Sequence, residues 1–287
     1  MRETYVSKNF RSDSLKLLYL AQRIVREYMG QGYTLTLRQL YYQFVARDII
    51  ENSERSYKRL GGLINDGRLA GYIDWEAIED RTREVSILSH WNHPSDIVRA
   101  CAEQFALDKW REQPNYVEVW VEKEALAGVI EPVCEEFDVP FFSCRGYPSQ
   151  SSVWRAGQRM KHVNGEPHIL HLGDHDPSGI DMTRDIEDRI YLFAQRPVVV
   201  RRLALNMDQI EEFKPPPNPA KLTDSRALDY VRQYGRSSWE LDALEPKILT
   251  DLVAEEVMRL RDDTLWDEEV SREERYRSKL RDIAANL

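Results

Sequence analysis

Between residues 114 and 205 the sequence alternates short apolar stretches with longer amphipathic ones, and this alternation constrains the fold more than any other feature. Strands are expected at 116–122, 139–144, 168–173 and 197–205, because these stretches are rich in β-branched and aromatic residues. Helices are expected between them, at 124–137, 151–162 and 178–194. Strands separated by helices form parallel sheets, so the sequence predicts an α/β domain with a Rossmann-like, mainly parallel sheet.

Two of these strands end in carboxylates. Glu122 closes the first strand, and Asp174 and Asp176 follow the third. The carboxyl ends of parallel strands meet at one edge of a sheet, where ligands bind. Three oxygen donors there suit one or two Mg²⁺ ions, with Mn²⁺ as a substitute, and such ions serve phosphoryl transfer. An Asp-x-Asp pair at this kind of turn also caps helices, and that alternative stays open.

The first 95 residues predict a helical domain. Helices are expected at 13–29, 37–48 and 54–68, and a short extended stretch follows at Tyr72–Trp75. This order is typical of a helix-turn-helix with a wing. The third helix carries four basic side chains that favour DNA phosphates, although a solvated helix face explains them equally well. These candidate DNA-binding residues are Arg55, Lys58, Arg59 and Arg68.

The remaining boundaries follow from breaks in these patterns. We predict a winged-helix domain at 1–95, a helical linker at 96–113, and the α/β domain with its C-terminal extension at 114–287. The stretch Lys214–Pro219 contains four prolines and predicts an extended surface turn. The tail from about residue 240 is expected to be helical and highly charged.

The net charge of −9 at first argues against DNA binding, since DNA affinity depends on basic residues. The charge is uneven, however. Residues 1–95 hold 14 basic and 12 acidic side chains, whereas residues 250–287 hold 11 acidic and 7 basic ones. We therefore expect weak non-specific affinity for DNA, with engagement dependent on Mg²⁺, dimerisation or a second subunit, and an acidic tail that faces away from DNA or towards a partner.

Location is constrained by what the sequence lacks. No apolar run approaches the roughly 18 residues that span a bilayer, and the first ten residues have no apolar signal-peptide region. The three cysteines form no C-x-x-C pair, which disfavours a disulfide framework. We expect no membrane association and a cytoplasmic protein, associated with the nucleoid if it is bacterial or archaeal.

Four motifs together resemble one family. The strand end Val121-Glu122-Lys123 followed by Asp174-x-Asp176-Pro-x-Gly179 resembles a Toprim domain, the metal-binding module of topoisomerases and primases. Gly146-Tyr147-Pro148 resembles the G-Y-P loop, and Arg38-Gln-Leu-Tyr41-Tyr42 the R-x-x-Y-Y motif, of the A subunit of type IIB DNA topoisomerases (topoisomerase VI) and their meiotic double-strand-break relatives. The resemblance covers roughly residues 30–210 and suggests a minimal version of that family.

The resemblance implies a mechanism. Tyr42 would attack DNA and leave a 5′-phosphotyrosyl bond, Arg38 would assist it, and Glu122, Asp174 and Asp176 would hold Mg²⁺. It also implies a homodimer, in which the tyrosine of one protomer meets the metal site of the other, double-stranded DNA as the substrate, and a separately encoded ATPase B subunit. Ordinary packing remains the alternative for Tyr42, Arg38 and, more strongly, Tyr41.

Several residues stay outside this scheme. His175 stands where the family has a small residue, and is interpreted mainly as a bystander that could otherwise contact a phosphate or a metal-bound water. Asp181 and Glu124 are expected to be charges at helix starts, with a third metal contact as the alternative for Asp181. The H-x-x-H pairs, at 90 and 93 and at 168 and 171, lack partners for a zinc set. No chemistry is assigned to the acidic-apolar patch Trp239–Leu244.

Two other functions remain open. The first is a Toprim nuclease, as in mobile-element, anti-plasmid or anti-phage systems, in which metal-activated water cleaves DNA and Tyr42 is not catalytic. The second is a DNA-binding regulator with an inactive core, which three mutually repelling carboxylates disfavour.

Overall fold

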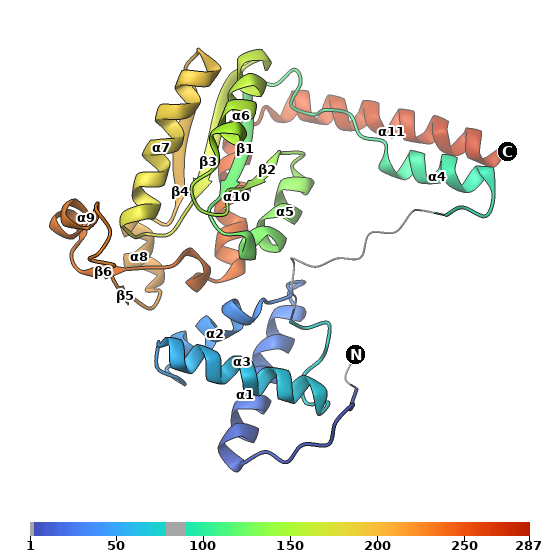
Figure 1. Ribbon diagram of the computed structural model, residues 1–287. Coiled ribbons are helices and arrows are strands. Elements are labelled where there is room, and N and C mark those ends of the chain that lie inside the picture. Colours follow the sequence, from blue (N-terminus) through green and yellow to red (C-terminus); the bar gives the residue numbers. More distant parts are fainter. Residues whose placement is uncertain (1–2, 79–89) are drawn as a thin grey trace.

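The computed structural model describes residues 3–78 and 90–287, and it has two lobes (Figure 1). The helical lobe contains α1 (Ser12–Met29), α2 (Leu37–Ala46) and α3 (Glu54–Leu69), close to the predicted ranges. Thr36 begins α2 with a capping box, because its hydroxyl accepts from the Gln39 N–H at 3.2 Å while the Gln39 side chain accepts from the Thr36 N–H at 2.8 Å. Apolar residues of all three helices form one core, which includes Leu18, Leu40 and Ile64.

The predicted wing is not seen in the described part of this lobe. Residues 72–75 form bends rather than a strand. Isolated backbone bridges join Ala70 to Thr4 and Ile78 to Leu35. Residues 79–89, which belong to the predicted 1–95 domain, lie outside the described residues.

The sheet lobe confirms the predicted parallel α/β arrangement. Its strands β1 (Asn115–Val121), β2 (Phe141–Ser143), β3 (Glu166–Leu172) and β4 (Val199–Ala204) pair in the order β2-β1-β3-β4, all parallel. Alternate residues of β1 face opposite sides of the sheet, so Val119 packs in one core and Trp120 in another.

Helices cover both faces of the sheet. On one face lie α6 (Gln150–His162) and α7 (Pro177–Ala194). On the other lie α5 (Ala127–Glu136), which follows the short 3₁₀ turn η1 (Glu124–Leu126), and α10 (Pro246–Leu260) from the C-terminal extension. The extension thus completes the core of the sheet lobe as a structural part of it.

The rest of the extension shapes the edge that faces the helical lobe. After α8 (Met207–Phe213) the chain forms a small antiparallel pair, β5 (Asn218–Pro219) and β6 (Ser237–Ser238), with α9 (Ala227–Tyr234) between them. The 3₁₀ turn η2 (Leu241–Ala243) then packs against α2, and its Ala243 joins the core of the helical lobe. A hydrogen bond of 3.1 Å between the hydroxyls of Tyr33 and Thr250 also joins the lobes.

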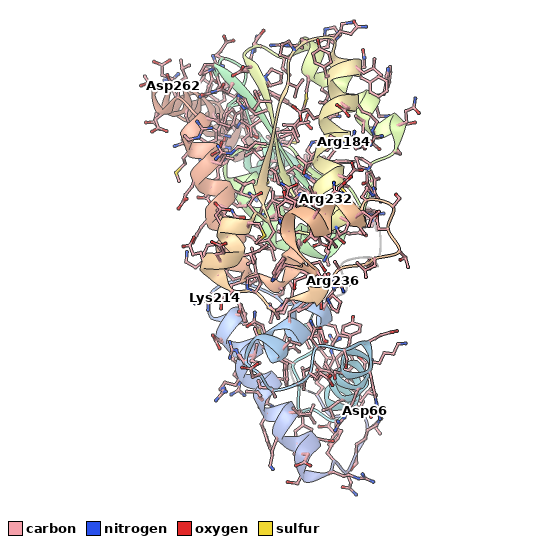
Figure 2. The ribbon with its side chains drawn as sticks, turned by 90° about the vertical axis from the view of Figure 1, so that its left-hand side faces the viewer. Asp66, Arg184, Lys214, Arg232, Arg236 and Asp262 are labelled. Atoms are coloured by element: carbon pink, nitrogen blue, oxygen red, sulfur yellow. The ribbon has the colours of Figure 1, made fainter. Side chains whose placement is uncertain are left out.

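The linker and the tail form an arm. The helix in the predicted linker 96–113 is shorter than expected, because α4 spans Pro94–Gln104 and residues 105–111 are not helical. The tail helix α11 (Asp263–Ala285) runs beside α4, and the pair projects from the sheet lobe (Figure 1). Asp262, which caps α11, lies at the end of the molecule remote from Asp66 of the helical lobe (Figure 2). The acidic tail is therefore distant from α3.

Candidate functional site

The site is a pocket of about 690 Å³ between the two lobes, at the carboxyl ends of β1 and β3. The helical lobe contributes residues of α2 and of the start of α3. The sheet lobe contributes the ends of β1 and β3 and the β5–β6 region. The lining residues are Arg38, Tyr41, Tyr42, Asn52, Ser53, Glu54, Tyr57, Lys123, Asp174, Asp176, Asn218, Pro219, Lys221, Ser238, Trp239 and Glu240.

At the base of the pocket, the ends of the two strands brace each other. Glu122, just after β1, accepts a hydrogen bond of 2.9 Å at Oε2 from the Asp174 N–H, just after β3. Asp174 in turn accepts one of 2.7 Å at Oδ1 from the Leu241 N–H. The loop after β3 is therefore held on both sides, by β1 and by the C-terminal extension.

Three carboxylates converge beside this brace: Asp174, Glu240 and Asp242, which we call the carboxylate cluster. One oxygen of each lies within 4.8 Å of the others, so the cluster could hold a metal ion. Oxygen ligands of this kind suit a hard divalent cation such as Mg²⁺. The cluster shares only Asp174 with the predicted set, since Glu240 and Asp242 come from the patch to which no chemistry was assigned.

Lys123 stands at the centre of the carboxylate cluster. Its ammonium lies 2.9 Å from Asp174 Oδ1 and 2.9 Å from Asp242 Oδ1, and it also pairs with Glu240. Burial disfavours the charged amine, but the three carboxylates outweigh it and raise the Lys123 pKa. Lys123 is therefore the cation that balances this cluster, and a metal ion would have to share its place or displace it.

Two buried carboxyls of the site, those of Asp174 and Glu122, have raised pKa values. Burial raises the pKa of Asp174 to about 7, and the neighbouring carboxylates add to the effect while Lys123 opposes it. Burial likewise raises the pKa of Glu122, and the charge of Asp176 adds to it. Without a metal ion, Asp174 and Glu122 therefore keep a proton to higher pH than ordinary carboxyls, whereas Lys123 and Arg38 overcome the effect of burial on Glu240 and hold its pKa below the usual range.

The other predicted metal ligands have structural roles in this arrangement. Asp176 is the N-cap of α7, and its Oδ1 accepts a hydrogen bond of 2.7 Å from the Gly179 N–H. This is the helix-capping role that the sequence left open as an alternative. Glu122 uses one oxygen to brace Asp174. Both lie close enough to influence each other's charge, so Glu122, Asp174 and Asp176 do gather at one edge of the sheet, as predicted.

The candidate nucleophile Tyr42 and its neighbour Arg38 lie in the same pocket. Arg38 pairs with Glu240, and its Nε lies 2.8 Å from Asp242 Oδ2, which brings α2 to the cluster. The Arg38 guanidinium carbon lies 5.9 Å from the centroid of the Tyr42 ring. Tyr42 is only 4% exposed, and burial together with Glu240 and Asp242 raises its pKa to about 12, against the opposing charges of Arg38 and Lys123.

Tyr41 serves a structural role. Its hydroxyl donates to Asn52 Oδ1 at 2.9 Å and accepts from the Ser53 N–H at 2.9 Å, so it holds the turn that leads into α3. Asn52 also hydrogen-bonds to Asn218 of β5, which ties this turn to the sheet lobe. The packing interpretation of Tyr41 therefore holds.

The four predicted DNA-binding residues of α3 divide into two groups. Arg55 and Arg59 are exposed, and no carboxylate pairs with either in residues 3–78 or 90–287. Lys58 forms an exposed ion pair of 2.7 Å with Glu54 of the same helix. Arg68 instead turns inward: it donates to the carbonyls of Trp75 and Ile78 and stacks 4.8 Å from the Trp75 ring, which is a structural role.

His175 anchors the segment that carries Glu240. It is buried, its Nδ1 lies 2.8 Å from the Tyr230 hydroxyl, and its ring packs edge-on against Trp239. Its backbone exchanges two hydrogen bonds with Trp239, of 2.8 and 2.9 Å. Burial lowers the His175 pKa to about 4, so the ring is neutral. It is thus a core histidine, buried and not among the residues that line the pocket.

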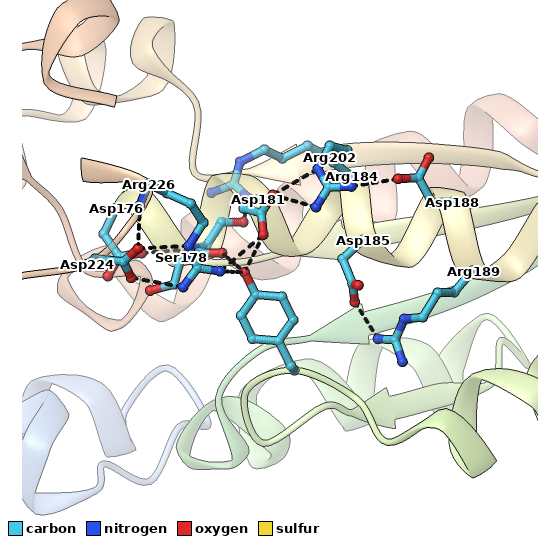
Figure 3. Close-up of polar contacts among 12 residues, drawn as sticks. Asp176, Ser178, Asp181, Arg184, Asp185, Asp188, Arg189, Arg202, Asp224 and Arg226 are labelled. Carbon is cyan, nitrogen blue, oxygen red and sulfur yellow. Dashed lines mark hydrogen bonds and ion pairs between the residues drawn. The ribbon is translucent and has the colours of Figure 1, made fainter. Parts of the chain in front are cut away.

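Asp181 belongs to a second polar network on the rim of the site (Figure 3). It accepts from the Tyr147 hydroxyl at 2.7 Å and pairs with Arg184 at 2.7 Å and Arg226 at 3.0 Å. The network ties the Gly-Tyr-Pro loop to α7 and to the segment before α9. The other predicted helix-start charge, Glu124, pairs with Arg145.

Comparison of this chain with protein-family models gave no match, and comparison with curated proteins gave none either. Among the described helices, none is both long enough and apolar enough to cross a membrane.

Proposed function

We propose that this protein cleaves DNA by attack of the Tyr42 hydroxyl on a backbone phosphate, in a reaction that depends on a divalent metal ion, with Mg²⁺ as the expected ion. One observation carries the proposal: the side chains of Tyr42 and Arg38 on α2 line the same pocket as Asp174 and Asp176, the carboxylates that follow β3. The resemblance of the motifs to topoisomerase VI A subunits supports it.

In this reaction, each residue of the pocket has its own role. The Tyr42 oxygen forms a bond to phosphorus, the bond to the 3′-oxygen of the neighbouring sugar breaks, and that oxygen takes up a proton to leave a 3′-hydroxyl. Because the Tyr42 pKa is raised to about 12, its proton must pass to a base, and the carboxylates beside it are the nearest candidates. Arg38 and Lys123 bring positive charge to the phosphate.

A metal ion at the carboxylate cluster would neutralise the charge that builds up on the phosphate. It would also offset the negative charges of Glu240 and Asp242, which together with burial raise the Tyr42 pKa. Glu122 positions Asp174 through its backbone N–H.

Hydrolysis is a second candidate, and the burial of Tyr42 favours it. A side chain that is 4% exposed, with its hydroxyl held protonated, is poorly placed to attack. In that case a water molecule activated at the carboxylates would cleave DNA, and Tyr42 would support Arg38.

Incubation with supercoiled DNA and Mg²⁺, followed by a detergent quench, separates the two reactions. Attack by Tyr42 leaves protein on 5′ ends, seen as a gel shift that protease removes. Tyr42→Phe should then abolish cleavage, whereas Tyr19→Phe, at an exposed tyrosine of α1 in the same lobe, is the control and should cleave as wild type does. If Tyr42→Phe cleaves as fast as wild type while Glu122→Ala is inactive, hydrolysis is the reaction. If neither variant nor removal of metal matters, both proposals fail.

A further inference from the structure

The size of the pocket limits what can reach the reactive groups. Its volume is about 690 Å³, and Tyr42 and Asp174 at its base are only 4% and 8% exposed. Pockets of about 300–1,000 Å³ enclose small ligands. One nucleotide fits that range, whereas a duplex does not, because its stacked base pairs are enclosed by two sugar-phosphate strands and form a much larger body.

Aromatic rings stand on two walls of the pocket. Tyr57 of α3 belongs to the helical lobe, and Trp239 follows β6 in the sheet lobe; both are partly exposed and line the pocket. Tyr57 packs edge-on against Tyr41 with 5.2 Å between centroids, and Trp239 packs edge-on against His175 at 5.7 Å. Rings held in this way provide stacking surfaces for unpaired bases, because every base has an aromatic face.

One unpaired cation lines the pocket, and a second lies next to it along the backbone. Lys221 lines the pocket, and Arg236 lies beside it, since the Ala220 N–H donates to the Arg236 carbonyl at 2.9 Å. Both side chains are exposed, and the structure gives neither an ion pair within residues 3–78 and 90–287. Figure 2 shows Arg236 at the junction of the lobes.

Charge in this part of the chain is of the opposite sign to the whole. Residues 214–236 contain five basic and two acidic side chains in a protein of net charge −9. In the pocket itself, Arg38 and Lys123 are already paired with carboxylates. Lys221 and Arg236 are therefore the cations that remain for a phosphate backbone.

We propose that the pocket receives an unpaired strand of DNA, with bases against Tyr57 and Trp239 and phosphates on Lys221 and Arg236. This inference rests on the proposed function, which supplies the reaction. It adds the class of substrate: DNA that is single-stranded, frayed or displaced from its partner strand, instead of an intact duplex. Arg55 and Arg59 of α3 would contact the flanking DNA.

DNA binding measured in EDTA, which removes divalent metal ions, tests the proposed substrate class separately from catalysis. Fluorescence anisotropy should show wild-type protein binding a labelled single strand at least tenfold more tightly than a duplex of the same sequence. Lys221→Ala/Arg236→Ala should weaken single-strand binding and lower the salt dependence, log Kd against log salt, by about 1.4, at about 0.7 per lost phosphate contact on a single strand.

Matched controls identify the surface. Lys214→Ala/Arg232→Ala also removes two basic side chains from exposed positions of the same segment, but neither lines the pocket or adjoins Lys221 through the Ala220–Arg236 backbone bond, so it should change single-strand affinity less than twofold. Tyr57→Phe should retain affinity, while Tyr57→Ala should lose at least threefold.

Equal or tighter binding of the duplex overturns the proposal, as does an unchanged salt slope in the Lys221/Arg236 variant. Cleavage of a relaxed duplex as fast as of a single strand overturns it while leaving the proposed reaction intact. Tight single-strand binding without cleavage keeps this inference and removes the proposed reaction.

Discussion

At the scale of single residues, Lys123 occupies the position in the carboxylate cluster where a metal ion would bind. It is a buried ammonium among three carboxylates, of which Glu240 and Asp242 also pair with Arg38, so Asp174 is the buried charge that depends on Lys123 most. The same position is where a divalent cation would compensate the same charges. Lys123 and a metal ion are therefore expected to substitute for one another in stabilising the fold.

Lys123→Met tests this substitution. Removal of one partner from a buried ion pair costs about 3–5 kcal/mol, because the remaining charges stay uncompensated. We expect a loss of this size in the free energy of unfolding in EDTA, measured by urea denaturation, and recovery of most of it in saturating Mg²⁺. Lys247→Met, at an exposed lysine paired with Asp251, is the control and should have little effect. A loss that Mg²⁺ leaves untouched would contradict the expected exchange.

Asp174 predicts how stability depends on pH. Its pKa is raised in the folded state, from 3.8 to about 7, so the folded protein binds a proton that the unfolded chain releases. Its contribution is complete below about pH 4 and is lost as the pH rises to about 7. In EDTA, stability should therefore decline across this window, and Asp174→Asn should flatten the decline, since its amide oxygen can still accept from Leu241. An identical pH profile for Asp174→Asn, from thermal melts at each pH, would rule out Asp174 as the source.

At the scale of elements, the site combines segments of very different predictability. The strands and helices of the sheet could be predicted because their apolar periods are regular, and parallel strands then bring Glu122, Asp174 and Asp176 to one edge. The contribution of Glu240 and Asp242 to the site could not be predicted from the sequence. It depends on a backbone pairing between Trp239 and His175, and such a pairing leaves no local sequence pattern. Two carboxylates two residues apart in an otherwise apolar patch were the only signal.

The helical lobe shows the same limit. Capping residues fix where α2 begins, and its apolar face fixes its core. The direction of a long side chain depends on neighbours distant in sequence, so Arg68 was predicted to contact DNA and instead holds Trp75 and Ile78.

The turn between β3 and α7 depends on a glycine. A Cβ on Gly179 would lie 2.1 Å from the Asp174 carbonyl oxygen, so any side chain there forces the loop away from the pocket. We expect Gly179→Ala to destabilise the protein by about 1–3 kcal/mol, as overpacked substitutions do, and to lower cleavage at least tenfold. Gly62→Ala is the matched control: open space surrounds it on α3, so it should stabilise the helix by about 0.5–1 kcal/mol. Calorimetry and the cleavage assay together check both, and a fully active Gly179→Ala protein would contradict the close approach.

At the scale of the whole molecule, the two lobes of one chain build one pocket. Arg38 binds Glu240 and Asp242, Asn52 binds Asn218, and Tyr33 binds Thr250 across the same junction. These contacts bring Tyr42 to the carboxylate cluster of its own chain. The resemblance to topoisomerase VI A subunits implies the opposite arrangement, in which a tyrosine meets the metal site of a partner protomer.

Mixing two inactive variants distinguishes these arrangements. Tyr42→Phe lacks the nucleophile, and Glu122→Ala lacks the brace for Asp174. If each site is built within one chain, every site in the mixture carries one defect, and cleavage should stay at the level of the separate variants. If sites form between protomers, mixed dimers contain one site with both intact groups, and covalent 5′-linked product should reappear on mixing. Because this readout requires two folded variants, thermal melts of each come first. Recovered cleavage would show that the pocket within one chain is a resting arrangement and that the lobes must separate before the reaction.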